Sequence, residues 1–291
     1  PIVNFEHNGS NATYNSMIHI AGEVYALAYE GANNKATLST IKITSTGSVT
    51  NSSFVATEEH DSNNGEHNEL IHISGDKYAL FYRGQNNDGF AKVFKITANG
   101  ETIEQLSSAL EFATYDYYEG SAVKMTDSTL VLAHTGRNFD GFIKTFKVAS
   151  DGSTITIIQD VEHDGSYGQY NSLVRADKDT YVLSYNGSNN YGRVQTFTIP
   201  PDGNSITEVA NAAFADNGYS YWNNLVQVDH NTYLNAGYSY NTSGSSGYYG
   251  VLETFTIPTD GSTITSVANL KFSTTSGTGT HNKLLKLNAN E

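Results

Sequence analysis

The chain has 291 residues, with 16 Lys and Arg against 30 Asp and Glu, a formal net charge of −14 at pH 7, and no Cys. An acidic surface of this kind does not neutralise phosphates, which excludes nucleic acid and anionic membranes as partners. The lack of Cys excludes disulfides, zinc–thiolate sites and a Cys nucleophile, and no apolar run reaches the roughly 18 residues of a membrane span.

The first residues, Pro1-Ile2-Val3-Asn4, contain neither an initiator Met nor an apolar signal core, so we expect a processed or trimmed chain. Only 16% of the residues are charged, and Asn, Ser, Thr, Gly and Tyr are abundant. This composition is typical of exported β proteins. We therefore expect an extracellular location, or one at a cell or virion surface.

One short apolar segment recurs six times along the chain. Its second position is Asn in five copies and Gly in one, and successive copies are 53, 52, 51, 52 and 59 residues apart. A period of this size indicates a repeat protein. The copies are residues 14–20, 67–73, 119–125, 170–176, 222–228 and 281–287.

Three further β-segments follow in each complete repeat, and we name the four segments a, b, c and d. An Asn-Gly or Asp-Gly pair stands between c and d in four repeats. Such pairs predict a tight type I′ hairpin, because both central residues of that turn need positive φ. Helix signals are absent. Segment b covers 25–29, 78–82, 130–134, 181–185 and 233–237, and segment c covers 40–43, 93–96, 145–148, 196–199 and 254–257.

Four antiparallel strands repeated about every 50 residues predict an all-β fold, a β-propeller of four-stranded antiparallel blades. A solenoid is the alternative, but its parallel rungs of roughly 20 to 30 residues do not accommodate these hairpins. We expect one domain over residues 1–291. Its repeats are at about 8–60, 61–112, 113–163, 164–214 and 215–273.

The two ends predict five complete blades plus partial blade strands, a segment d in 1–7 and a segment a in 274–291. Three arrangements are compatible with this pattern. A longer natural chain closes a ring of six or seven blades, five blades close alone, or a neighbouring molecule completes the unfinished blade. The last alternative predicts self-association through open blade edges.

The d-to-a and b-to-c connections share one face of a propeller, and here they are long and rich in Tyr, Asn, Gly and His. Tyr offers rigid contact area and Asn, Ser and Gly offer adaptable hydrogen bonds, which predicts a recognition surface. The alternative is that Asn and Gly only form turns and that the aromatic residues only pack. The candidate ligand-binding residues are Trp222, Tyr221, Tyr240, Tyr248, Tyr170, Tyr14, His67, Asn171 and Asn223.

Two polar columns mark the end of segment d. His7, His60 and His163 share one column, and the next contains Asp61 and Asp164. We expect the His residues to cap the core and the Asp residues to form Asx turns. A calcium site is the alternative for the acidic column; otherwise we expect no cofactor and no metal.

Motifs of known enzymes are missing: the sequence has no Gly-x-Ser-x-Gly, His-Glu-x-x-His or P-loop. A Glu column at positions 6, 59, 111 and 162 repeats from blade to blade. Glycosidases need two carboxylates in distinct environments, so this repetition favours a structural role. We therefore expect a protein that is not an enzyme.

The fullest copies of the repeat read Asp-Gly-Ser-x-Ile-Thr, then Tyr-Asn-Ser-Leu-Val, then Asp-x-Asp-Thr-Tyr-Val-Leu. Over the whole chain this pattern resembles the tandem blades of bacterial and phage-borne surface propeller proteins. Lectin-like propellers are similar in architecture only. The resemblance implies a fold and no particular activity.

Three functional hypotheses follow. The first is an extracellular, non-enzymatic recognition or adhesion module whose partner is a glycan or surface polymer. The alternative is a structural subunit of an extracellular filament or virion appendage that assembles through the incomplete blade. The third is a glycoside hydrolase.

Overall fold

The computed structural model describes residues 6, 7, 9, 12–49, 53–241, 247–273, 277 and 281–286, without the side chains of 215–219, 240 and 241. Strands dominate this part of the chain, and its helical elements are four three-residue 3-10 turns. The all-β prediction is therefore confirmed. Among the described residues, no helix has the length and apolar character needed to cross a membrane.

The chain divides into two compact units, Pro1–Leu130 with Phe146–Ile157, and Val131–Thr145 with Ile158–Glu291. Unit 1 packs its interior around residues such as Leu38, Leu80 and Phe94. Unit 2 packs its own around residues such as Val182, Tyr233 and Phe255. These side chains come from segments b and c, whose near-continuous apolar sequence suits strands buried on both faces.

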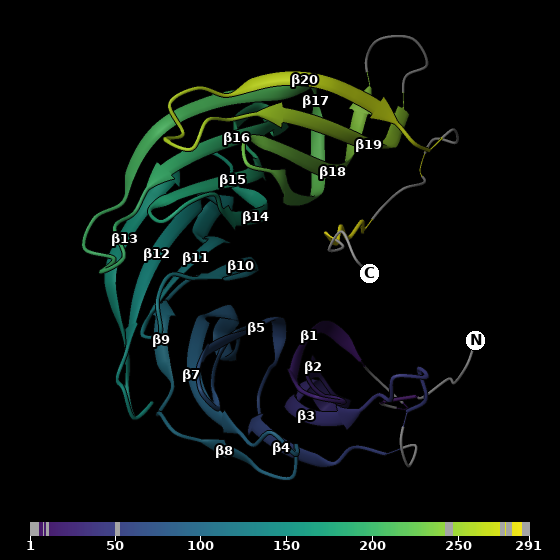
Figure 1. Ribbon diagram of the computed structural model, residues 1–291, viewed down its shortest axis with the longest axis vertical. Coiled ribbons are helices and arrows are strands. Elements are labelled where there is room, and N and C mark those ends of the chain that lie inside the picture. The colour runs from purple at the N-terminus through teal and green to yellow at the C-terminus, as the bar shows by residue number, and fades with distance from the viewer. Residues whose placement is uncertain are drawn as a thin grey trace. The chain divides into compact units, whose positions relative to one another are not determined.

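Unit 1 contains two complete antiparallel sheets whose strands lie side by side in chain order (Figure 1). In the second sheet, segment d is split into two short strands, and the Ser107 hydroxyl accepts the Val93 N–H at the break (2.9 Å). The first sheet is β1 (Thr13–Ala21), β2 (Val24–Glu30), β3 (Ala36–Lys42) and β4 (Ala56–Asp61); the second is β5 (Glu66–Ser74), β6 (Lys77–Arg83), β7 (Gly89–Ile96), β8 (Ile103–Gln105) and β9 (Leu110–Ala113).

The division between the units passes through a third sheet, in the order β10 (Tyr118–Lys124), β11 (Thr129–Thr135), β12 (Gly141–Val148) and β13 (Ile155–Asp164). The 3-10 turns connect segments b and c in four repeats. They are η1 (Ala32–Asn34), η3 (Gln85–Asn87), η4 (Arg137–Phe139) and η5 (Ser188–Asn190).

Unit 2 contains a seven-stranded sheet because one long strand serves two repeats. β17 pairs with β16 through its first half and with β18 through its second half. We expected a loop between segments d and a here, but Tyr191 pairs with Tyr219 and keeps the chain extended. The strands are β14 (Gln169–Arg175), β15 (Thr180–Asn186), β16 (Tyr191–Thr198), β17 (Thr207–Asp229), β18 (Thr232–Asn241), β19 (Gly247–Thr256) and β20 (Thr265–Lys271).

The predicted end strands are only partly visible. Residues 1–5 and 287–291 lie outside the described residues, as do 274–276 and 278–280. Residues 281–286 form no assigned strand, yet the Leu284 N–H donates to the Asn224 side chain, a contact that other repeats also make. The count of five complete blades stays a prediction.

Within each unit, a side-chain acceptor on segment a joins neighbouring repeats. In unit 1, Ser16 Oγ accepts the Leu70 N–H (3.0 Å) and Glu69 Oε1 accepts the Ala122 N–H (3.2 Å). In unit 2, Ser172 Oγ accepts the Leu225 N–H at 2.9 Å. The acceptor always follows the Asn or Gly position of the repeat, so the period of the sequence is also the period of this hydrogen bond.

A second link lies at the c-to-d turns. The hydroxyl of a segment c Thr donates to the carbonyl of the turn Gly one repeat later, as in Thr40 to Gly100 (2.6 Å) and Thr196 to Gly261 (2.7 Å). The type I′ prediction is wrong, because Gly100 has φ +76° but the preceding Asn99 has no positive φ. Asn99 instead accepts the N–H two residues later (3.1 Å), as an Asx turn does.

Segment c also has a recurrent buried polar position, just before this Thr or, in the second repeat, before Val93, and its residue type varies among the repeats. In unit 1, Ser39 bonds Thr57 (3.0 Å), and the Lys92 ammonium donates to the His60 carbonyl. In unit 2, the Lys144 ammonium pairs with Asp160. Each partner compensates the loss of hydration on burial. The column consists of Ser39, Lys92, Lys144, Gln195 and Glu253.

The segment a link makes a stability prediction. Ser172→Ala removes the acceptor of the buried Leu225 N–H, so the free energy of unfolding should fall by about 1–3 kcal/mol in urea titrations. Ser205→Ala, at an exposed position, is the control and should change it by less than about 0.5 kcal/mol. Equal effects of the two substitutions would show that the link contributes nothing.

Candidate functional site

Each described segment a begins with a residue in the left-handed backbone region. In four repeats the pairing with segment b shifts at this point, as between Glu66 and Glu69, so segment a contains one extra residue. Such bulges re-aim side chains, and a bulky residue with positive φ is strained. The residues are Tyr14 (φ 55°), His67 (48°), Glu119 (51°), Tyr170 (56°), Trp222 (51°) and His281 (54°).

The Asn that follows stabilises this bulge. Asn68 Nδ2 donates to the carbonyl three residues earlier, Gly65 (2.7 Å), and Asn171 Nδ2 does the same to Gly168 (2.9 Å). The recurrent Asn therefore serves the backbone, and it fixes the direction of the side chain that precedes it.

In unit 1, residues at and beside two of these bulges surround the Arg83 guanidinium at the end of β6. Glu66, paired with Arg83 across the strands, approaches Nη1 at 2.6 Å. Nη2 lies 3.2 Å from the Tyr118 hydroxyl and 4.0 Å from Asp116 Oδ1. The Tyr118 ring lies beneath the guanidinium, with its centroid 4.4 Å from Cζ. We call Glu66, His67, Arg83, Asp116 and Tyr118 the Arg83 cluster.

Two buried features position the loops of the Arg83 cluster. Tyr117 is fully buried against Phe112, and its N–H donates to the Asn87 carbonyl (3.0 Å), so Asp116 and Tyr118 extend from a fixed point. Gly65 leads into β5, and a Cβ there would lie 2.4 Å from the Ala36 Cα. Only glycine permits this approach of the two backbones.

His67 is a neutral member of the Arg83 cluster at pH 7. Burial, and secondly the charge of Arg83, lowers the pKa of His67 to about 4. Its Nδ1 accepts the Glu119 N–H (3.4 Å), so the neutral ring carries its proton on Nε2. Its ring also contacts Tyr14 and Tyr118, with centroids 4.3 and 5.3 Å away.

In unit 2 the corresponding rings form a continuous group that we call the aromatic surface. Trp222 is its centre, 4.4 Å from the His281 ring and 5.4 Å from Tyr238 between centroids. Tyr238 stacks on Tyr248 at 5.2 Å. Burial raises the pKa of Tyr221, and the neighbouring phenols raise it further, so the Tyr221 hydroxyl stays protonated. The members are Tyr170, Tyr221, Trp222, Tyr238, Tyr248 and His281.

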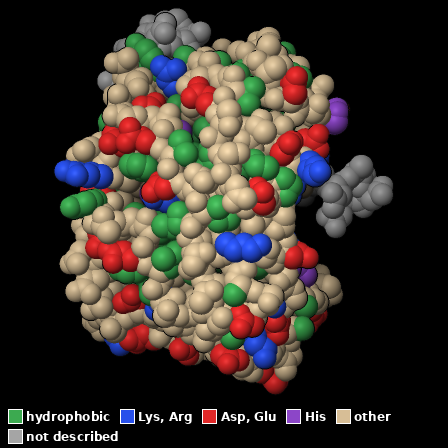
Figure 2. All heavy atoms as spheres, turned by 90° about the vertical axis from the view of Figure 1, so that its left-hand side faces the viewer, with side chains coloured by type: hydrophobic (Ala, Val, Ile, Leu, Met, Phe, Trp, Pro, Cys, Tyr) green, Lys and Arg blue, Asp and Glu red, His purple; other side chains and the backbone are tan. Residues whose placement is uncertain are grey.

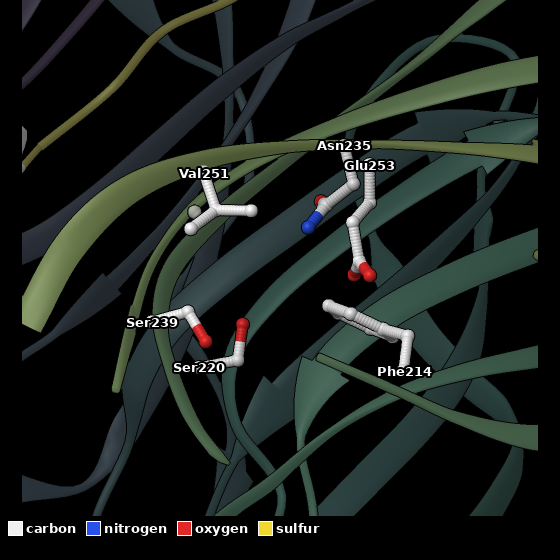
Figure 3. A pocket seen from close by; sticks show the side chains of 7 residues that line it. Phe214, Ser220, Asn235, Ser239, Val251 and Glu253 are labelled. Atoms are coloured by element: carbon white, nitrogen blue, oxygen red, sulfur yellow. The ribbon is translucent and has the colours of Figure 1, made fainter. Parts of the chain in front are cut away.

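A small pocket also lies in unit 2, beneath β18 and β19. Figure 3 shows the Glu253 carboxylate on one side, near Phe214, with the Ser220 and Ser239 hydroxyls across from it. The cavity volume is about 10 Å³, room for about one water molecule. Ligand pockets are usually roughly 300–1,000 Å³, so this one is too small to be the substrate site.

The structure brings most of the predicted site residues together within their own units. Tyr14 and His67 are in contact in unit 1, and Tyr170, Tyr221, Trp222 and Tyr248 share the aromatic surface in unit 2. Asn171 and Asn223 are buried, and their side chains are hydrogen bonded within the chain. The side chain of Tyr240 lies outside the described residues.

The polar columns and Asn-rich loops form local structure. Asp61 and Asp164 accept the backbone N–H two residues later, each at 3.0 Å, which confirms the Asx turns. The Asn residues of the b-to-c loops, such as Asn33 and Asn86, have positive φ inside the 3-10 turns. No group of three or more His, Asp or Glu arranged for a metal ion occurs within the described residues.

Sequence reasoning missed Arg83, Glu66, Asp116 and Tyr118. The available signal was a break in the repeat: the strand b end aligned with Arg83 is Glu30, Asn186 or Tyr238 in other sheets, so Arg83 alone contributes a cation among these. The pairing of Arg83 with Glu66 depends on the register between β5 and β6, which could not be read from the sequence.

No protein family model and no curated protein matches the sequence. Solved structures do match. The periplasmic gluconolactonase of Pseudomonas aeruginosa has a TM-score of 0.61 at 13% identity, covering 91% of this chain and 72% of its own. A protein of Bacteroides fragilis provisionally named a 6-phosphogluconolactonase gives 0.58 at 13%, over 88% and 80%. One of Bifidobacterium bifidum, provisionally named an exo-β-1,3-galactanase, gives 0.51 at 14%, over 95% and 97%.

These similarities establish an all-β, propeller-type fold, which confirms the predicted fold class. They also contradict the expectation of a non-enzymatic recognition or adhesion module, because the proteins that share the fold are named as enzymes. The prediction failed because it searched for short catalytic motifs, whereas catalytic groups in a repeat protein come from different repeats. At 13–14% identity the likeness shows the fold alone, so the activity is a proposal.

The buried His60 predicts a dependence of stability on pH. Burial, and secondly the charge of Lys92, lowers the pKa of His60 to about 3, against about 6.5 when unfolded. The unfolded chain then binds a proton that the folded chain excludes, so the stability present above pH 6.5 is lost as the pH falls toward 3. The slope is up to about 1.4 kcal/mol per pH unit for this one group.

His60→Phe keeps a ring against Tyr82 and Phe94 and removes the titration, so urea titrations between pH 7 and 4.5 should give a shallower slope. His230→Phe, at an exposed position, is the control and should leave the slope unchanged. An unchanged slope in His60→Phe would show that His60 is protonated in the folded protein.

Proposed function

We propose that this protein is a hydrolase of sugar-derived substrates that cleaves a lactone or related ester at the Arg83 cluster. The observation that carries the proposal is a guanidinium, a phenol and two carboxylates held together at the ends of β5, β6 and β10. The names of the structurally similar gluconolactonase and 6-phosphogluconolactonase support the choice of substrate.

The chemistry assigns different tasks to the two carboxylates. Glu66 approaches Arg83 at 2.6 Å and orients it. Asp116 is more exposed, with 40% of its side chain accessible, so water reaches it. In the proposed reaction, Asp116 accepts a proton from water while the water oxygen bonds to the lactone carbonyl carbon.

The negative charge that develops on the carbonyl oxygen needs hydrogen-bond donors. Arg83 offers its guanidinium N–H groups, and its buried Nε has no hydrogen-bond partner among the described residues. The Nε2–H of neutral His67 is a further donor. The Tyr118 hydroxyl accepts from Arg83 and donates to Asp116 Oδ1 (3.4 Å), so it holds these two groups in place. Such preorganised donors stabilise the tetrahedral intermediate. The ring C–O bond then breaks, and the leaving oxygen takes the proton.

A glycoside hydrolase is the second candidate function. Glu66 and Asp116 lie at the two arms of one guanidinium, 2.6 and 4.0 Å from it, in different degrees of exposure. Two carboxylates in distinct surroundings are what glycosidic bond cleavage requires.

The lactonase proposal is tested by measuring hydrolysis of glucono-1,5-lactone, with the uncatalysed rate subtracted, alongside a panel of aryl glycosides. Asp116→Asn should lower kcat/KM on the lactone by about 10²–10⁴-fold, because the general base is lost. Asn tolerates the positive φ of 34° at this position.

Asp127→Asn is the matched control, since Asp127 pairs with Lys124 in the same unit, away from the Arg83 cluster, and it should keep full activity. Turnover of a glycoside but of no lactone would favour the second candidate. Full lactonase activity in Asp116→Asn would refute the assigned base.

The aromatic surface is proposed to bind the sugar rings of a neutral carbohydrate. Its rings offer apolar faces, its phenols offer hydrogen bonds, and the Trp222 indole is half-exposed at its centre. Amphipathic aromatic groups of this kind suit pyranose rings, which have apolar faces and hydroxyl edges.

Trp222→Asn removes the indole and keeps a residue that accepts φ of 51°. Its dissociation constant for neutral polysaccharide, measured by affinity electrophoresis, should rise about 3- to 10-fold, while Trp222→Phe retains most of the binding. Equal loss in both variants, or a lowered melting temperature in Trp222→Asn, would indicate a packing role.

A further inference from the structure

The Arg83 cluster has more negative than positive charge. Arg83 contacts the carboxylates of Glu66 and Asp116. Burial raises the pKa of the Tyr14 phenol, and the charges of Glu66 and Glu30 raise it further. Two carboxylates therefore contact one guanidinium, and the charge of a third acts on the adjoining Tyr14.

The other polar groups at this site are neutral at pH 7. The pKa of His67 is lowered to about 4, and burial raises the pKa of the Tyr118 phenol. The neighbouring lysines are engaged elsewhere: Lys92 donates to the His60 carbonyl, and Lys35 pairs with Glu59 at 2.7 Å. Arg83 itself is compensated by Glu66, so it offers hydrogen bonds more than net charge.

The field of the whole protein has the same sign. The chain carries a net charge of −14, and Figure 2 shows acidic side chains scattered over one face with few Lys and Arg between them. A phosphorylated or carboxylated sugar approaching a protein of this net charge is repelled, and the repulsion slows its association. Phosphate-binding sites are instead rich in unpaired Arg and Lys or in helix N-termini.

We infer that the substrate taken at the Arg83 cluster is an uncharged sugar derivative, a lactone without phosphate or carboxylate, although one structural neighbour is named for a phosphorylated lactone. This inference rests on the proposed function. It follows from the excess of carboxylates over the single guanidinium. The same excess of negative charge distinguishes this site from one that binds a phosphorylated sugar.

The experiment compares glucono-1,5-lactone with its 6-phosphate, both for turnover and for binding. Binding is measured by calorimetry with the unreactive lactam of each sugar, so preference is observed even without catalysis. We expect kcat/KM for the neutral lactone to exceed that for the phosphate at least 10-fold at about 20 mM salt. The gap should narrow at about 500 mM salt, because salt screens the repulsion.

Glu66→Gln removes one of the carboxylates and should reduce the preference for the neutral lactam. The matched control is Glu59→Gln, which changes the net charge equally at an exposed position of strand β4 and should leave the preference unchanged.

The outcomes separate the two proposals. Tighter binding or faster turnover of the phosphorylated compound overturns the inference of an uncharged substrate. Binding of the neutral lactam without turnover of any lactone overturns the proposed hydrolase and supports the inference. Failure to bind either lactam, with no turnover, overturns both.

Discussion

The structure depends on one hydrogen bond that recurs from repeat to repeat, from a backbone N–H of one segment a to a side-chain acceptor on the segment a before it. Ser16, Glu69, Ser172 and Asn224 provide this acceptor. Each bond joins residues more than 50 positions apart in the sequence. It fixes how far one segment a is shifted along its neighbour. The Thr-to-Gly bonds at the c-to-d turns act at the other end of the sheets. Fixed at both ends, neighbouring sheets bury their apolar faces with little freedom to slide.

The bulge that precedes this link connects the fold to the candidate site. The residue upstream of this acceptor adopts positive φ whatever its side chain, and the following Asn supports the bulge where it donates to the backbone, as Asn68 and Asn171 do. Repeats therefore present Tyr, His, Glu or Trp from the same backbone position without altering the sheets. Chemical variety at this position costs the fold little, which explains how unit 1 builds a charged cluster and unit 2 an aromatic one from the same repeat.

Much of the fold was predictable from the sequence, because it is encoded in local patterns. The period, the antiparallel order of a to d and the Asx turns at Asp61 and Asp164 all follow from residue type and spacing. The type I′ turns and the loop inside β17 were wrong, because a bulge or an extended continuation depends on pairing with a distant strand. The site was harder to predict. Arg83 meets Glu66 only through strand register, and Asp116 reaches Arg83 only because Tyr117 is buried.

The buried polar column of segment c gives each repeat a separate identity. Nearly identical tandem units risk pairing out of order while the chain folds, since any b strand fits any c strand by shape. A lysine in two repeats, a glutamine in a third and a glutamate in a fourth occupy equivalent interior positions, and the two lysines have different partners, the His60 carbonyl and Asp160. Exchanging two such strands would bury a charge beside the wrong neighbour. The buried polar column therefore distinguishes one repeat from another and favours the correct pairing of strands b and c during folding.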